Sequence, residues 1–246
     1  MKESLEISLT VARKELKVVL RRRSIVIYII ALPLLLAVAF TLVVQNDIVS
    51  SSGIVSDYQL GLESLTYFFV LLAAVLPASI AAYSIVGEKI EKSLEPLLAT
   101  PVTDGEILLG KSVAAFAPPI LSTWAGASIF MASTDYLTHG GLSYNYFPNW
   151  DSGIMLLLLA PLGAVLSIEV AVIASSRVND VRSANQIAGL MYIPFMGVFI
   201  AATTGVINLG VGDLLIFSLI LLILDVVAFF LSKSTFGREE ILTKWK

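Results

Sequence analysis

The chain has 246 residues, of which 57% are hydrophobic and only 14% are charged, and its formal net charge is −3. A soluble domain typically has about 25% charged residues, so the composition argues against a soluble protein and favours one that lies mostly in a lipid bilayer. The chain has no cysteine, which excludes disulfides and thiolate metal sites. No basic block stands apart from a membrane edge, so we expect no nucleic-acid partner.

The first element, in residues 1–24, is predicted to be an amphipathic helix. Between residues 5 and 20, apolar side chains recur on one helical stripe and basic side chains lie mostly off it. The stripe consists of Leu5, Leu9, Ala12, Leu16, Val19 and Leu20. Such a helix is expected to lie in the membrane interface, with its basic side toward anionic headgroups. The alternative is a basic tail that only sets orientation.

Six apolar runs follow, each long enough to cross a hydrocarbon core, which takes about 20 residues. They occupy residues 25–44, 65–86, 113–132, 154–174, 187–207 and 214–231. The runs lack the polar faces of soluble helices and the alternation of barrel strands. The predicted fold is therefore an all-α integral membrane protein, with six transmembrane helices over residues 25–232 and a tail at 233–246.

The basic residues predict the orientation of these spans. All 16 Lys and Arg fall in the first tail, near residues 87–112, near 177–182 and in the last tail, whereas segments 45–64, 133–153 and 208–213 have none. Positive charge marks the cytoplasmic side. Both termini are therefore expected in the cytoplasm, and the protein is expected to be a multi-pass component of the cytoplasmic membrane.

Two carboxylates fall within the predicted spans, Glu169 in the fourth and Asp225 in the sixth. An ionised carboxylate at the bilayer centre is costly and rarely faces lipid. Each is therefore a candidate for a translocation path, or else for an interhelical hydrogen bond. Glu169 has the further alternative of reaching Arg177 or Arg182 at the inner edge.

Small residues and prolines are expected to shape the packing of the spans. Every fourth residue on one face of the fourth span is small: Gly163, Ser167, Ala171 and Ser175. Such a stripe lets another helix come close. Prolines occur in five of the six spans and could act as hinges, although they are also ordinary in membrane helices.

The segment "GEILLGKS", residues 105–112, matches the phosphate-loop pattern G-x-x-x-x-G-K-[ST]. However, Thr103 and Glu106 form a capping box ahead of an apolar run, which predicts a helix here instead of an open phosphate-binding loop. The inner segments are also too short for a nucleotide-binding domain. We therefore expect no catalytic site and no cofactor on this chain.

The second inner segment, residues 87–111, is charged at both ends and apolar in its middle. By residue chemistry alone it could dock a soluble partner or simply connect two spans. Its pattern resembles one in the membrane subunits of type-2 ATP-binding-cassette exporters, E-x-x-x-G-T-L-E-x-L-L-x-T-P-V followed by E-I-L and G-K. The matching residues are Glu88, Glu91, Leu94, Glu95, Leu97, Leu98, Thr100, Pro101, Glu106, Ile107, Leu108, Gly110 and Lys111. The opening "ARKELKVVLRRRS" also resembles the interfacial elbow of that family.

The resemblance implies a permease subunit that pairs with a second, identical or different permease and with two copies of a separate ATPase subunit, on which Mg-ATP would bind. Glu88, Glu91 and Glu95 would lie at the docking interface, with Leu94, Leu97 and Leu98 as its apolar contacts. Thr100 and Pro101 would set the turn back to the membrane, before Glu106. The alternative is a secondary transporter that couples protons or sodium through Asp225 and Glu169.

Overall fold

A computed structural model describes residues 2–50, 59–90, 102–138, 146–178, 180–207 and 209–235. In these ranges the chain is helical and contains no strand. Six helical stretches are long and apolar enough to cross a membrane. The tail predicted at 233–246 lies mostly outside the described residues.

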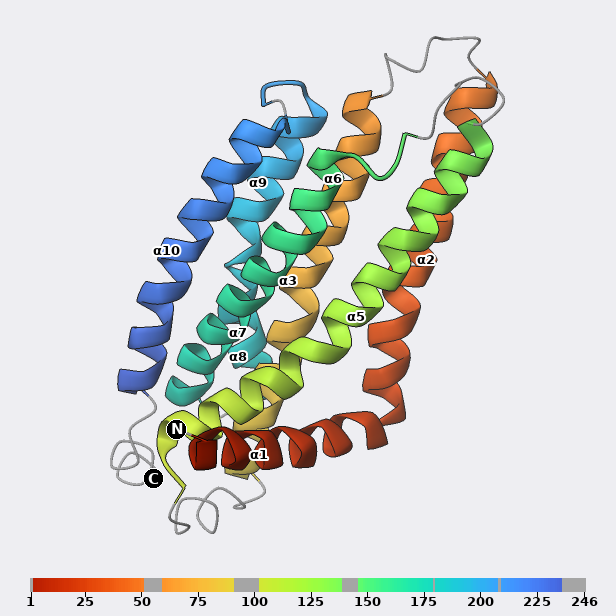
Figure 1. Cartoon of the computed structure of the whole chain (residues 1–246). Coiled ribbons are helices and arrows are strands. Elements are labelled where there is room, and N and C mark those ends of the chain that lie inside the picture. Colours follow the sequence, from red (N-terminus) through yellow and green to blue (C-terminus); the bar gives the residue numbers. More distant parts are fainter. Residues whose placement is uncertain are drawn as a thin grey trace.

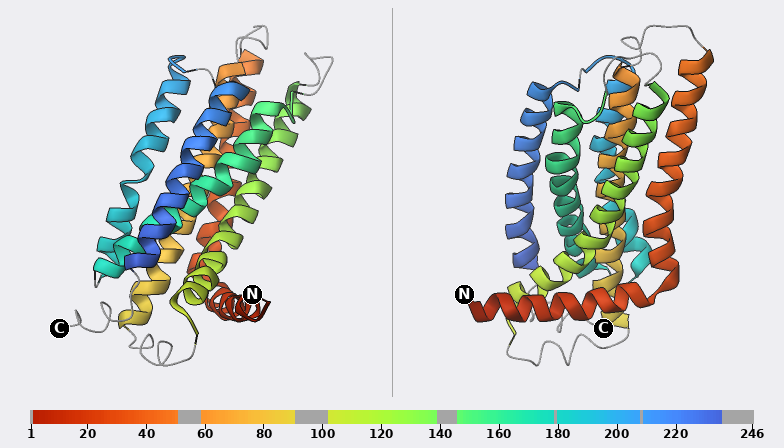
Figure 2. Two further views of the ribbon diagram at one scale, coloured as in Figure 1. Left: turned by 60° about the vertical axis from the view of Figure 1, so that its left-hand side comes forward. Right: turned by 45° about the vertical axis from the view of Figure 1, so that its right-hand side comes forward.

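The helices form an upright bundle with one helix laid across its base (Figure 1). The basal helix is α1 (Lys2–Arg21), which a bend at Arg22 joins to α2 (Arg23–Ser50). The bundle continues with α3 (Gln59–Ile90) and α5 (Asp104–Thr138). Figure 2 shows α1 running along the end of the bundle at which α10 (Val211–Thr235) also ends.

The fourth span is one continuous helical stretch with a wider turn near its start. It comprises α6 (Trp150–Ile154), the π-helical η2 (Met155–Leu159) and α7 (Ala160–Arg177). Pro161 lies two residues after the end of the π segment. A proline has no N–H to donate and its ring crowds the carbonyl four residues earlier, so the wider turn makes room for it.

The fifth span differs from the prediction of residues 187–207. It begins earlier, with α8 (Val181–Gly189), turns at Leu190 and Met191, and continues as α9 (Tyr192–Thr203). It ends in a Schellman motif: Gly205 has φ of +71°, and the Val206 N–H donates to the Ala201 carbonyl at 2.9 Å. Hydropathy alone could not locate this end, because the residues beyond it are also apolar.

Close helix packing confirms the prediction from the small-residue stripe. Gly163, Ser167, Ala171 and Ser175 are all buried on α7, which packs extensively against α3. A Cβ at Gly163 would lie 3.2 Å from the Phe195 ring of α9. On the other side of the bundle, a Cβ at Gly126 of α5 would lie 2.8 Å from the Pro33 carbonyl oxygen of α2.

Candidate functional site

The base of the bundle, where α1 meets α3 and α5, contains the structured flanks of the predicted docking segment. α3 ends at Ile90 and α5 begins at Asp104, so both helices that border residues 91–101 reach this base. The docking residues from Glu91 to Pro101, namely Glu91, Leu94, Glu95, Leu97, Leu98, Thr100 and Pro101, lie outside the described residues. Glu88 belongs to the last turn of α3.

Glu106 has a structural partner at the start of α5. Its carboxylate Oε2 accepts a hydrogen bond from the Thr103 backbone N–H at 2.9 Å, and the Glu106 N–H donates to Thr103 Oγ1 at 3.4 Å. The predicted capping box is therefore confirmed. The residues of "GEILLGKS" are helical, and their backbone N–H groups are not arranged as a phosphate cradle.

The face that α1 presents to the bundle is rotated from the predicted apolar stripe. Ser8, Ala12, Glu15 and Val19 are buried, whereas Leu9 and Leu20 of the predicted stripe are exposed. The buried face therefore contains two polar residues. The sequence analysis did not identify Ser8 or Glu15 as buried, since a carboxylate on an amphipathic helix is usually solvated.

Gly110 of α5 allows α1 to pack directly against the α5 backbone. A Cβ added at Gly110 would lie 2.7 Å from Val11 Cβ and 2.8 Å from the Ser8 carbonyl oxygen. Cβ atoms do not approach other atoms so closely, so any larger residue at position 110 would push the two helices apart.

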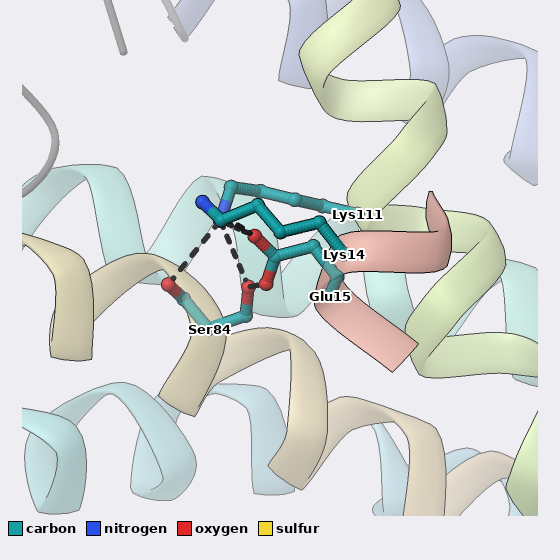
Figure 3. Close-up of polar contacts among 4 residues, drawn as sticks. All are labelled: Lys14, Glu15, Ser84 and Lys111. Carbon is teal, nitrogen blue, oxygen red and sulfur yellow. Dashed lines mark hydrogen bonds and ion pairs between the residues drawn. The ribbon is translucent and has the colours of Figure 1, made fainter. Parts of the chain in front are cut away.

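A buried polar junction connects α1, α3 and α5 next to this contact (Figure 3). Lys111 Nζ donates to Ser84 Oγ at 3.0 Å and lies 3.5 Å from Glu15 Oε1. Ser84 Oγ donates in turn to Glu15 Oε2 at 3.1 Å. The Lys111 and Glu15 side chains are only 3% and 7% exposed, and Lys14 also lies 3.5 Å from Glu15 Oε1 at the rim. We call Glu15, Ser84 and Lys111 the basal junction.

A second contact joins Arg22, at the bend after α1, to Tyr83, the residue before Ser84 on α3. The Arg22 guanidinium donates to the Tyr83 hydroxyl and also lies over the Tyr83 ring, 4.3 Å from its centroid. Hydrogen bonding and cation–π attraction therefore act on the same pair of side chains. Together with the basal junction, this pair holds the bend between α1 and α2 against α3.

The two carboxylates within the spans lie on neighbouring helices, α7 and α10. Glu169 and Asp225 are both buried, and the two helices that bear them pack against each other. Asp225 lies on the buried stripe of α10 that also includes Ser218, Leu221 and Ala228. Within the described part of the chain, neither Asp225 oxygen nor Glu169 Oε2 has a hydrogen-bond partner. The alternative that Glu169 reaches Arg177 or Arg182 is not observed, because both arginines are exposed and no ion pair joins either to Glu169.

The described part of the chain offers no metal centre, since it contains no group of three or more His, Cys, Asp and Glu side chains that could hold an ion. His139, the single histidine of the sequence, lies outside the described residues.

Comparison with known proteins places these features in a family context. The family model described as "ABC-2 family transporter protein" matches residues 9–240, which is nearly the whole chain. A search of the curated proteins found no match.

Proposed function

The chain belongs to the ABC-2 transporter family, and from this premise we propose that it is the permease subunit of an ATP-driven exporter. A permease of this family is a multi-pass membrane protein that works with an ATPase subunit and generally has no catalytic site of its own. In the proposed complex, this chain pairs with a second permease in the cytoplasmic membrane. Two ATPase subunits bind Mg-ATP and dock on the segment 87–111 of each permease.

The basal junction is the observation that supports docking at this segment. Segment 87–111 runs from the end of α3 to the start of α5; Ser84 lies on α3 just before the segment, and Lys111 is its last residue, on α5. Both side chains contact Glu15 of α1. A displacement of the segment by a docked ATPase would therefore move α1, α3 and α5 together. ATP-driven movement of a permease requires such a rigid connection between the docking segment and the spans.

Family membership favours this function over the secondary transporter that the sequence also allowed. A secondary transporter would depend on Glu169 and Asp225 for ion coupling, so Glu169→Gln or Asp225→Asn would abolish transport. The proposed exporter depends on segment 87–111 instead, so substitutions at Leu94, Leu97 and Leu98 would be the damaging ones.

The experiment that tests the proposal is purification of the tagged chain from native membranes in mild detergent. Co-purifying proteins are identified while ATP hydrolysis is measured. We expect an ATPase subunit to co-purify, and Leu97→Asp to remove it by placing a charge in the apolar contact. Leu142→Asp, in the opposite loop, is the matched control and should leave the ATPase bound.

Cross-linking gives a direct measure of proximity, because the chain has no cysteine of its own. A single cysteine introduced by Leu97→Cys should cross-link to the ATPase subunit without background. If no ATPase co-purifies in several detergents, or if Leu97→Asp leaves it bound, the docking proposal is wrong.

A further inference from the structure

A largely apolar cavity of about 290 Å³ lies between α5, α7 and α10. Its walls include Phe116, Val165, Val172 and Phe229, and it lies toward the end of the bundle at which α1 crosses. Val113 at its edge is exposed on the surface of α5. Val113 belongs to the apolar stretch Gly105–Thr138, which is long enough to cross a membrane. A molecule dissolved in the bilayer can therefore reach it from the side.

The cavity contains one ionisable group, the carboxylate of Glu169. Glu169 is 7% exposed, and its Oε2 has no hydrogen-bond partner among the residues that the structure describes. Ser232 also lines the cavity, but its hydroxyl donates a hydrogen bond to the Phe229 carbonyl at 3.1 Å and not to Glu169. A buried carboxylate without a donor is costly, so its presence in an apolar cavity calls for a partner from outside the chain.

Asp225 adds to the negative potential beside this cavity. It does not line the cavity, but it is buried one turn from Phe229 on α10, which packs against the helix of Glu169. Two buried carboxylates on packed neighbouring helices repel each other in a medium of low dielectric. A cation held at Glu169 would relieve that repulsion, whereas an anion would increase it. The site therefore selects for positive charge.

We propose that this cavity binds a hydrophobic molecule carrying a protonated amine, with its apolar body against α5 and α10 and its N–H groups donating to Glu169. The amine supplies the donors that Oε2 lacks, and a hydrogen bond between charged groups is about twice as strong as a neutral one. The volume lies at the small end of ligand cavities, about 300–1,000 Å³, which suits a single chain or a compact ring system. The amine can come from a free amphiphile or from the headgroup of an aminophospholipid.

The test uses the full chain in phosphatidylcholine nanodiscs without any ATPase partner, so its outcome is independent of the proposed exporter function. The probe is dodecylamine carrying a diazirine, with the labelled peptides identified by mass spectrometry and the affinity obtained by displacement with unlabelled dodecylamine. We expect labels on α5, α7 and α10 within the cavity. Dodecanol, which has no charge, and dodecyltrimethylammonium, which has no N–H, should displace the probe only weakly.

Two substitutions and one control distinguish the contribution of the Glu169 charge to binding from that of the cavity shape. Glu169→Gln should weaken dodecylamine binding by about 10- to 100-fold, because it removes a charge-assisted hydrogen bond. Val113→Trp fills the edge of the cavity from an exposed position and should also block binding. Glu63→Gln alters a buried carboxylate on α3 that accepts from the Tyr146 hydroxyl at 3.3 Å and does not line the cavity, so it should bind the probe normally.

Replacing part of the phosphatidylcholine with phosphatidylethanolamine identifies the source of the amine. Competition by phosphatidylethanolamine would assign the site to an aminophospholipid headgroup, and its absence would assign it to a free amphiphile. The proposal is overturned if Glu169→Gln and Val113→Trp both bind dodecylamine like the unmodified protein. It is equally overturned if dodecanol competes as well as dodecylamine, or if the labels map elsewhere.

Discussion

At the scale of single residues, two neighbours on α5 determine how α1 is held. Gly110 lets α1 lie against α5, and Lys111 binds Glu15 of α1 and Ser84 of α3. Gly110 and Lys111 are also the second glycine and the lysine of "GEILLGKS", the segment that matches the phosphate-loop pattern. Their conformation and contacts give them a packing role, since both lie in a regular helix and the lysine amine is held inside the protein.

Gly110→Ala is expected to destabilise the protein, although alanine is the better helix former by about 1 kcal/mol. The new Cβ would meet Val11 at 2.7 Å, and relief requires α1 to move. Gly105→Ala is the matched control on the same helix, because nothing lies within 4 Å of its added Cβ. The measurement is the thermal unfolding midpoint in nanodiscs. Equal midpoints for the two variants would contradict the close approach.

Breaking the basal junction from one side is expected to cost more than removing it entirely. Lys111→Met leaves Glu15 buried beside Ser84, and loss of one partner of a buried pair costs about 3–5 kcal/mol. Combining it with Glu15→Gln removes the carboxylate charge that Lys111 balanced beside Lys14, so the double variant should recover part of that stability. A double-mutant cycle on unfolding free energies measures the coupling. Additive effects would mean that the two groups do not interact.

At the scale of elements, the short helix α8 depends on a local cap at its start. The Asp180 carboxylate Oδ2 accepts from the Ser183 N–H at 3.0 Å, satisfying a free donor of the first turn. This backbone hydrogen bond, together with that from the Ser183 hydroxyl and the nearby Arg182, lowers the pKa of Asp180 below its ordinary value. Asp180 precedes the membrane-spanning stretch that begins at Val181, so it can titrate with the solvent.

The start of α8 is therefore expected to loosen in acid. Because the pKa of Asp180 is lower in the folded state, its contribution is complete above the ordinary aspartate pKa and is lost as pH falls through the folded value. Hydrogen–deuterium exchange protection of residues 182–184, corrected for intrinsic rates, should fall over that range. Asp180→Asn keeps an acceptor but does not titrate, so its protection should not change. A fall of the same size in Asp180→Asn would exclude Asp180 as the cause.

At the scale of the whole molecule, the basic residues and the crossing of α1 are found at the same end of the bundle. Within the described residues, the basic side chains of α1, of the start of α5 and of the end of α7 lie at the base, where α1 crosses and where the helices bordering segment 87–111 end. The opposite end has exposed aromatic side chains, including Tyr136 and Trp150, each 81% exposed. Aromatic side chains suit a membrane interface, and positive charge resists translocation.

Cysteine labelling in intact cells tests this orientation without background from native thiols. A membrane-impermeant maleimide should label Tyr136→Cys in intact cells, because that residue lies at the outer end of α5. It should label Lys17→Cys, on the exposed side of α1, only after the membrane is permeabilised. Labelling of Lys17→Cys in intact cells would reverse the orientation.

The features that the sequence alone determined are those that depend on neighbouring residues. Six spans follow from continuous apolar runs, and the start of α5 follows from Thr103 and Glu106, which are three residues apart. The resemblance in segment 87–111 agreed with the family that residues 9–240 match. The docking role of that segment stays a prediction.

The features that only the tertiary structure decided depend on residues far apart in the chain. Glu15 and Ser84 are separated by 69 positions and Ser84 and Lys111 by 27, so no local pattern could show that they meet. The same holds for the buried face of α1, for the break between α8 and α9, and for the cavity around Glu169. Periodicity indicates that a helix has an apolar side, but the shape of the neighbouring helices decides which side is buried and what a buried charge can bind.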